Sequence, residues 1–203
     1  MTSETGFAPH LFRACSEPQL CRPRQVLRRM NMKSLRVLVP LVLMSLCAVA
    51  VAQSDAQKSF DQLKTLAGTW EGVVKTDPPT PEADGKHVQA TLRVTSMGNA
   101  MLHEMKVEGR PDDPITMVYM DNDRLTLTHY CDAGNRPRMV AKASPDGKTV
   151  EFDFVDVSGS TEYGHMHHAV FTMIDANHHI EDWTFMVPGD KHVQAHMELQ
   201  RTK

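Results

Sequence analysis

The sequence predicts an all-β fold, a barrel of roughly ten antiparallel strands that run up and down, closed by a short N-terminal helix. Three observations predict it. Apolar and polar residues alternate with a period of two along most of residues 70–201, short turn-forming stretches separate the alternating runs, and only one segment has helical spacing. A sheet of so many strands curls or closes, and closure removes the exposed edges.

The helix is expected just before the first strand. Phe60, Leu63 and Leu66 fall on one face at helical spacing, Ser59 can cap the helix, and Gly68 can end it.

The strands are expected in sequence order, each paired with its neighbours, because the connections between them are short. Asp121-Asn122-Asp123 and Pro188-Gly189-Asp190 are examples of residues that tolerate tight turns. Longer polar stretches at 77–85, 109–114 and 158–164 are expected to surround one mouth. The predicted strands are 70–75, 88–96, 101–108, 116–120, 125–131, 138–143, 150–156, 166–174, 180–187 and 193–201.

The N-terminal segment has the pattern of a secretory signal. Lys33 and Arg36 precede an apolar run, 37–51, that ends in Ala50-Val51-Ala52. The run is shorter than the roughly 20 residues of a membrane span. We therefore expect residues 1–31 to be a mis-assigned upstream start or an extended, disordered basic segment, 32–52 a signal peptide, and 53–203 one barrel domain. That domain is expected in the periplasm or secreted, without a membrane anchor.

Cleavage changes the charge and the cysteine content of the chain. It removes seven of the 22 basic and two of the 25 acidic residues, which leaves a formal net charge of −8 with His neutral. Such a surface repels phosphate backbones and anionic lipids, so nucleic acid is not an expected partner. Cys131 is the one cysteine of the four that remains, and burial is the commonest state of a free thiol.

Two segments resemble known families. Residues 63–72, LKTLAGTWEG, resemble the short helix and Gly-x-Trp of lipocalin-like, or calycin, barrels. Residues 125–139, LTLTHYCDAGNRPRM, are similar to a stretch in a family of uncharacterised exported bacterial proteins, and the similarity covers most of 57–201. The resemblance implies a barrel rather than a reaction. It also implies that Trp70 closes one barrel end against a basic residue on the last strand, where Arg201 is placed.

Strand alternation predicts which polar side chains face the lumen. If the apolar residues point inward, His103, His129, Cys131 and Glu181 point inward with them, beside Trp183. One alternative is an internal network, in which Glu181 accepts a hydrogen bond from a histidine and no ligand is bound. Our preferred hypothesis is a pocket in which these five residues bind and orient a small, hydrophobic molecule.

Arg138 is a further candidate for ligand binding. Arg136 and Arg138 lie beside a tight turn, and a guanidinium at the barrel mouth can hold a carboxylate bidentately. The expected ligand is therefore lipophilic or carboxylate-bearing. Because Arg138 alternates out of phase with Met139, a lumen position for it requires a β-bulge.

A histidine cluster supports an alternative function. His165, His167 and His168 lie on one predicted strand, and His178-His179 begin the next, so we expect a hairpin to bring them together. Imidazole and methionine thioether ligands suit copper, and imidazole also suits zinc. Periplasmic copper or zinc binding is thus the second hypothesis, although no recognised zinc-binding spacing occurs.

Catalysis has little support in the sequence. There is no Gly-x-Ser-x-Gly motif and no phosphate-binding loop, and no cofactor is indicated. We expect a protein that is not an enzyme. A structural or interaction domain with a filled core is the third hypothesis.

Overall fold

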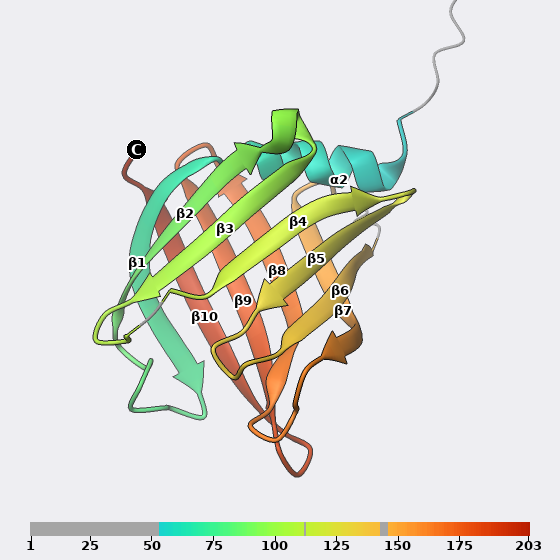
Figure 1. Cartoon of the computed structure of the whole chain (residues 1–203). Coiled ribbons are helices and arrows are strands. Elements are labelled where there is room, and N and C mark those ends of the chain that lie inside the picture. The colour runs from blue at the N-terminus through green and yellow to red at the C-terminus, as the bar shows by residue number, and fades with distance from the viewer. Residues whose placement is uncertain (1–52, 112, 143–145) are drawn as a thin grey trace, which may run out of the picture. The chain divides into compact units, whose positions relative to one another are not determined.

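The computed structural model describes residues 53–111, 113–142 and 146–203, and the predicted signal peptide and upstream segment lie outside them. Within the described residues, ten strands form one closed antiparallel barrel in which β10 returns to pair with β1 (Figure 1). The predicted fold class is confirmed, and no strand bound differs from its predicted one by more than two residues. The elements are α2 (Asp55–Lys64), β1 (Gly68–Asp77), β2 (His87–Thr95), the 3₁₀ turn η1 (Ser96–Gly98), β3 (Ala100–Val107), β4 (Ile115–Asp121), β5 (Arg124–Tyr130), β6 (Arg136–Lys142), β7 (Thr149–Ser158), β8 (His165–Asp175), β9 (His178–Val187) and β10 (Lys191–Arg201).

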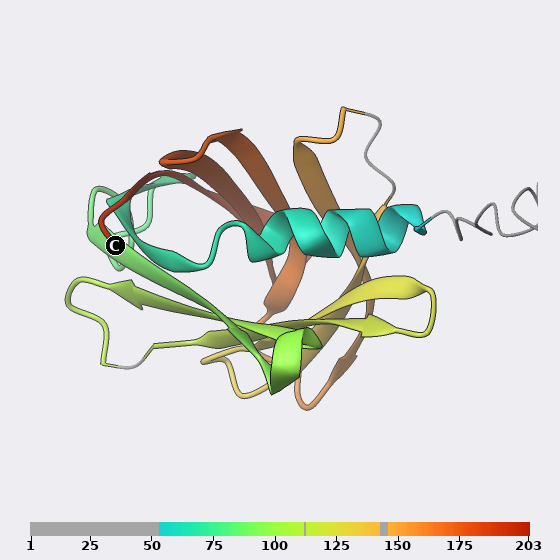
Figure 2. The same cartoon turned by 90° about the horizontal axis from the view of Figure 1, so that it is seen from above.

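The helix α2 lies across one end of the barrel (Figure 2). It begins earlier than predicted, because the hydroxyl of Ser54 accepts a hydrogen bond from the backbone N–H of Gln57 at 3.2 Å and caps it. Ser59, the predicted cap, is a buried residue inside the helix. The predicted start was late because the apolar spacing of the helix begins only at Phe60, after a mainly polar first turn. Phe60 and Leu63 are buried against the barrel core.

Arg201 holds together the end of the barrel near α2. Its guanidinium carbon lies 4.0 Å from the centre of the Trp70 ring, the contact that the lipocalin-like resemblance implied. The same side chain donates hydrogen bonds to the backbone carbonyls of Ala67, Thr65 and Ala176 at 2.7, 3.0 and 2.8 Å. It therefore joins β10 to the segment between α2 and β1 and to the turn between β8 and β9.

The seam between β1 and β10 depends on Gly72. A Cβ at this position would lie 2.2 Å from the carbonyl oxygen of Glu198 on β10. The glycine therefore lets the first and last strands approach closely enough to close the barrel.

The two ends of the barrel differ. Neighbouring strands are antiparallel, so the connections β1–β2, β3–β4, β5–β6, β7–β8 and β9–β10 all lie at the end away from α2 (Figure 1). The α2 end is packed by large apolar side chains. These include Phe60, Leu63, Trp70, Phe152 and Phe171, none more than 2% exposed. Any free lumen space is consequently expected at the other end.

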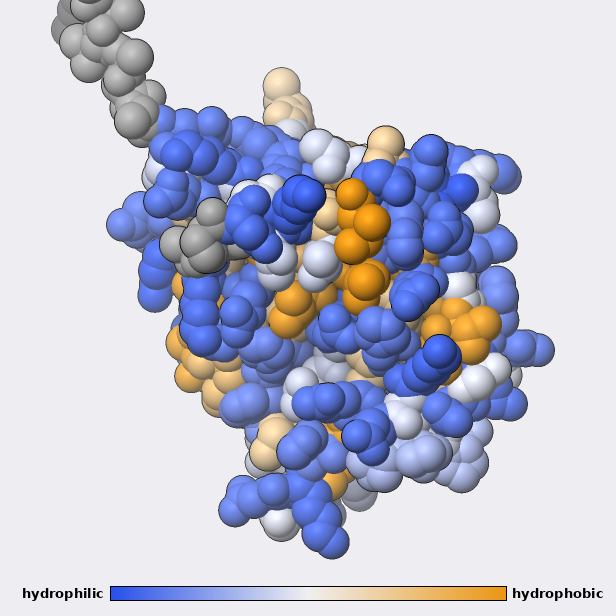
Figure 3. All heavy atoms as spheres, turned by 180° about the vertical axis from the view of Figure 1, so that it is seen from behind, coloured by the Kyte–Doolittle hydropathy of each residue, from blue (hydrophilic) through white to orange (hydrophobic). Residues whose placement is uncertain are grey.

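Polar side chains dominate the face of the barrel shown in Figure 3. On the face seen from behind, hydrophobic residues form small, separate patches within a hydrophilic surface (Figure 3). Across the part of the chain that is described, no helix has the length and hydropathy needed to cross a membrane.

Candidate functional site

The barrel lumen contains a cavity of about 370 Å³ at the end away from α2. This volume lies within the usual range of ligand pockets. Most of its wall is apolar and comes from residues of five strands, β1, β3, β8, β9 and β10. The apolar wall includes Val74, Met105, Val107, Met166, Phe185 and Met197.

Two of the polar side chains that line the cavity, Thr116 and His129, form one wall of it. They are opposite each other on β4 and β5, and the Thr116 hydroxyl lies 2.8 Å from Nδ1 of His129. Both side chains line the cavity, and they are 1% and 6% exposed. The other ring nitrogen, Nε2 of His129, has no hydrogen-bond partner among the described residues. It also keeps some accessible surface. This nitrogen is therefore available to a molecule in the cavity.

The His129 ring is neutral at physiological pH. Burial, together with the nearby His103, lowers its pKa from 6.5 to about 4. A buried ring without an acidic partner disfavours the charged form. The polar wall thus offers hydrogen bonds but no positive charge.

Glu181 lies at the centre of a second polar group, beside the cavity. Its carboxylate is 0% exposed and lies 3.1 Å from Nε2 of His103, 3.0 Å from Nε2 of His179 and 3.0 Å from Nε1 of Trp183. Burial alone would raise the pKa of Glu181, but the charge and hydrogen bonds of His103, together with those of His179, outweigh it and hold the pKa well below its usual range. A carboxylate only accepts, so all three ring nitrogens donate to it.

This group is the internal network that the sequence allowed as an alternative, and it also shapes the cavity. His103 and Trp183 line the cavity, whereas Glu181 and His179 do not. The Trp183 ring stacks on His103 at 5.8 Å between centroids and lies 5.6 Å from the His129 ring. Glu181 therefore fixes two wall residues in place, and the structure gives it no direct contact with the cavity.

The cavity mouth carries charged residues and the thiol of Cys131. Cys131 is free, buried and lines the cavity, and burial raises the pKa of its thiol. Its Sγ lies 3.5 Å from the carboxylate of Asp132, which forms an ion pair with Arg110. Glu82, on the β1–β2 connection, lines the same mouth.

Arg138 is not among the residues that line the cavity. Its guanidinium pairs with Asp156 across the exposed face of β6 and β7, with Nε 3.2 Å from Oδ1. The strand pairing shifts between Arg138 and Met139, but the extra residue is Val155, on β7. The bulge therefore leaves the phase of β6 unchanged, and Met139 rather than Arg138 is buried.

The three histidines of the predicted metal site do not converge. Nε2 of His165 lies 3.2 Å from Nδ1 of His167, and both rings pack beside Phe154. The pairing of β8 with β9 shifts between Met166 and His168, with His167 as the extra residue. The side-chain contacts of His168 in the described structure are with β7 and not with these two rings.

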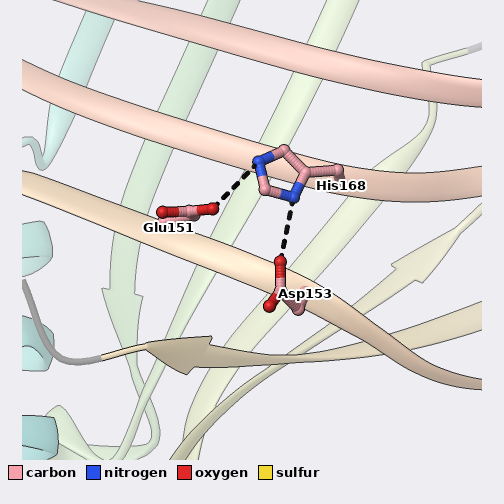
Figure 4. Close-up of side chains that lie close together, drawn as sticks. All are labelled: Glu151, Asp153 and His168. Carbon is pink, nitrogen blue, oxygen red and sulfur yellow. Dashed lines mark ion pairs between the residues drawn. The ribbon is translucent and has the colours of Figure 1, made fainter.

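His168 instead lies between two carboxylates of β7 (Figure 4). Its Nε2 is 3.6 Å from Glu151, and its Nδ1 is 3.2 Å from Asp153. One ligand atom from each of the three residues lies within 4.8 Å of the others. The Lys142 ammonium also pairs with both carboxylates. The described structure thus places one histidine of the predicted set in a cluster whose residue types suit a divalent cation.

His178 and His179 are at the opposite end of the hairpin from His165. Asp175 pairs with His178 beside the turn, and His165 pairs with Met186 at the far end. Nine residues of a strand span about 30 Å. The expectation that these histidines meet was wrong, because residues adjacent across a tight turn are far from the outer ends of the two strands.

Two important residues were not assigned to the lumen face from the sequence, although alternation could have placed both there. Thr116 shares a face with the buried Val118, and His179 shares a face with Glu181. Polar type alone gave no reason to prefer Thr116 to other threonines. His179 was grouped with its neighbours in sequence rather than with residues on its own face of the strand.

Comparison with known proteins adds no function. No family model matches the chain, and no curated protein is significantly similar to it. Among solved structures, a protein of unknown function from the DUF3598 family of Nostoc punctiforme superposes with a TM-score of 0.47 at 9% sequence identity. The match covers 69% of this chain and 49% of the other, so this chain spans about half the length of that structure.

Proposed function

We propose that this protein is an exported, lipocalin-like binding protein that holds a small, largely apolar molecule in its barrel lumen. The observation that carries the proposal is the cavity of about 370 Å³, with apolar walls and one polar wall formed by Thr116 and His129. Apolar walls with a few convergent polar groups are the usual composition of a small-molecule site. A domain with a filled core would need neither the space nor the open ring nitrogen.

Tryptophan fluorescence tests the proposal, because the two tryptophans occupy different places. Trp183 lines the cavity, whereas Trp70 is fully buried against Arg201 near α2. We expect a panel of lipophiles to include members that change the emission saturably in Trp70→Phe, which retains Trp183. The same members should leave the emission of Trp183→Phe unchanged.

Native mass spectrometry of the protein purified from its own host provides an independent measurement. We expect a bound small molecule that is released on unfolding. Repeated recovery of the empty protein, together with no fluorescence response of the wild type to the panel, would refute the proposed function.

Export is supported by the basic, apolar and small-residue pattern of residues 33–52. We expect N-terminal sequencing of the protein isolated from its host to begin at Gln53, and recovery from an extracytoplasmic fraction. A mature chain that retains Met32 would contradict export by cleavage.

Divalent-cation binding at Glu151, Asp153 and His168 is a second candidate function, favoured by the 4.8 Å grouping of their ligand atoms. Lys142 already neutralises the two carboxylates, so a cation would have to displace its ammonium group. Calorimetric titration with zinc and cupric ions tests this candidate. We expect Lys142→Ala to tighten binding and His168→Ala to abolish it, and wild-type affinity weaker than about millimolar would remove the candidate.

A further inference from the structure

We propose that the molecule in the lumen is held at Thr116 and His129 through an uncharged group that both donates and accepts hydrogen bonds, of the hydroxyl class. This inference rests on the proposed function and names the chemistry that the site selects. It follows from the hydrogen-bonding capacity of the polar wall and from the arrangement of charges around it.

The hydrogen-bonding capacity of the wall depends on which atom supplies the shared proton. If the Thr116 hydroxyl donates to Nδ1 of His129, the open Nε2 carries a hydrogen and donates to the ligand. If Nδ1 carries the hydrogen and donates to Thr116, Nε2 accepts. A hydroxyl group satisfies both arrangements, because it is donor and acceptor. A carboxylate only accepts and an ammonium only donates, so each fits one arrangement alone.

The charges near the wall also favour an uncharged group. His129 is neutral, since burial lowers its pKa to about 4. The ionised Glu181 on β9 is enclosed by three donors, and His103 of β3 faces it. No side chain that lines this wall therefore supplies a free charge to pair with an ionised ligand, and an unpaired buried charge is costly.

The remaining charges that line the cavity lie at its mouth. Arg110 is already paired with Asp132, and Glu82 adds a negative charge on the β1–β2 connection. The thiol of Cys131, between the wall and the mouth, is neutral because burial raises its pKa. An anionic group at the mouth would meet two carboxylates and one guanidinium that is already engaged, so the mouth does not favour an anion either.

Three ligands with the same chain separate these chemistries: decan-1-ol, decanoate and decylammonium. Their dissociation constants are measured at pH 7.5 by calorimetry and by the emission of Trp183. We expect decan-1-ol to bind at least about tenfold more tightly than either ion, because only the ions bury an unpaired charge. At pH 5.5, where a larger share of decanoic acid is protonated, its apparent affinity should rise.

Thr116→Val and His129→Leu test whether the wall is responsible. Each should weaken decan-1-ol binding by about fivefold or more. Each should also reduce the ratio by which decan-1-ol binds more tightly than decanoate and decylammonium. Thr126→Val is the matched control, because Thr126 is 1% exposed on the same strand as His129, does not line the cavity, and has a hydroxyl without a hydrogen-bond partner in the described structure. It should leave all three affinities unchanged.

The outcomes distinguish this inference from the proposed function. Decanoate or decylammonium binding as tightly as decan-1-ol at pH 7.5 would overturn the inference and leave lumen binding in place. Binding of apolar molecules without binding of decan-1-ol would also overturn the inference alone. So would Thr116→Val and His129→Leu variants whose affinities for decan-1-ol equal that of the Thr126→Val control. If nothing in the wider panel binds, the proposed function fails and the inference fails with it.

Discussion

Acidification should destabilise this protein through His129. Its pKa is about 4 in the folded protein against an ordinary 6.5, so the unfolded chain binds the proton more readily. Burial of this ring leaves the free energy of unfolding unaffected above about pH 6.5, and it lowers that free energy progressively as the pH falls from 6.5 toward 4. One pKa unit corresponds to about 1.4 kcal/mol, so the free energy of unfolding should fall by about 3 kcal/mol across this interval on account of His129 alone.

Urea unfolding monitored by circular dichroism, at half-unit intervals between pH 7 and pH 4, measures this pH dependence of the free energy of unfolding. His129→Gln removes the titrating ring and should flatten the dependence of the unfolding free energy on pH by most of 3 kcal/mol. His192→Gln is the control, because His192 is an exposed histidine on β10, and it should leave the wild-type dependence unchanged. A His129→Gln curve parallel to the wild type over this interval would refute the burial argument.

Three further predictions concern residues outside the polar wall. Glu181→Gln should lower the free energy of unfolding by about 3–5 kcal/mol in urea titrations, because three buried donors lose their ionised acceptor. Since the pKa of Glu181 is lowered, its contribution is present above about pH 4.5 and lost below it, so the variant should lose less stability than the wild type on acidification below that pH. Arg201→Lys should cost about 1–2 kcal/mol in the same assay, because an ammonium cannot reproduce three hydrogen bonds and stack on Trp70. Arg138→Ala should change neither the urea midpoint nor the affinity for lumen ligands, since its ion pair with Asp156 is exposed. A loss of affinity would show that Arg138 contributes to ligand binding.

Much of the fold could be predicted from the sequence, because burial on one face of a strand imposes a period of two. The same rule correctly placed His103, His129, Cys131 and Glu181 on inward faces, and all four are buried. Their roles in binding stay predictions. Alternation specifies a face, but it does not say whether the space in front of a side chain is filled or open.

The errors arose where the period of two is interrupted. Arg138 would need an extra residue on its own strand to face the lumen, but the extra residue lies on the partner strand at Val155. At His167 the extra residue lies on β8 itself, so the alternation of β8 changes phase between Met166 and His168. Bulges depend on the pairing of two strands, so a single strand's pattern does not locate them.

The buried polar groups of the lumen form two sets, the network around Glu181 and the Thr116–His129 pair, and only the second is open to the cavity. Every oxygen of Glu181 is engaged by donors from the barrel itself, and the removal of this network would be felt as lost stability whether or not a ligand exists. The Thr116–His129 pair is different, because it leaves one ring nitrogen open on a cavity. Replacing both partners of such a pair by apolar residues of similar shape costs little stability, and can increase it. A purely structural lumen would therefore gain nothing by keeping a buried, neutral histidine at this wall, and a molecule that uses its free nitrogen supplies the missing reason.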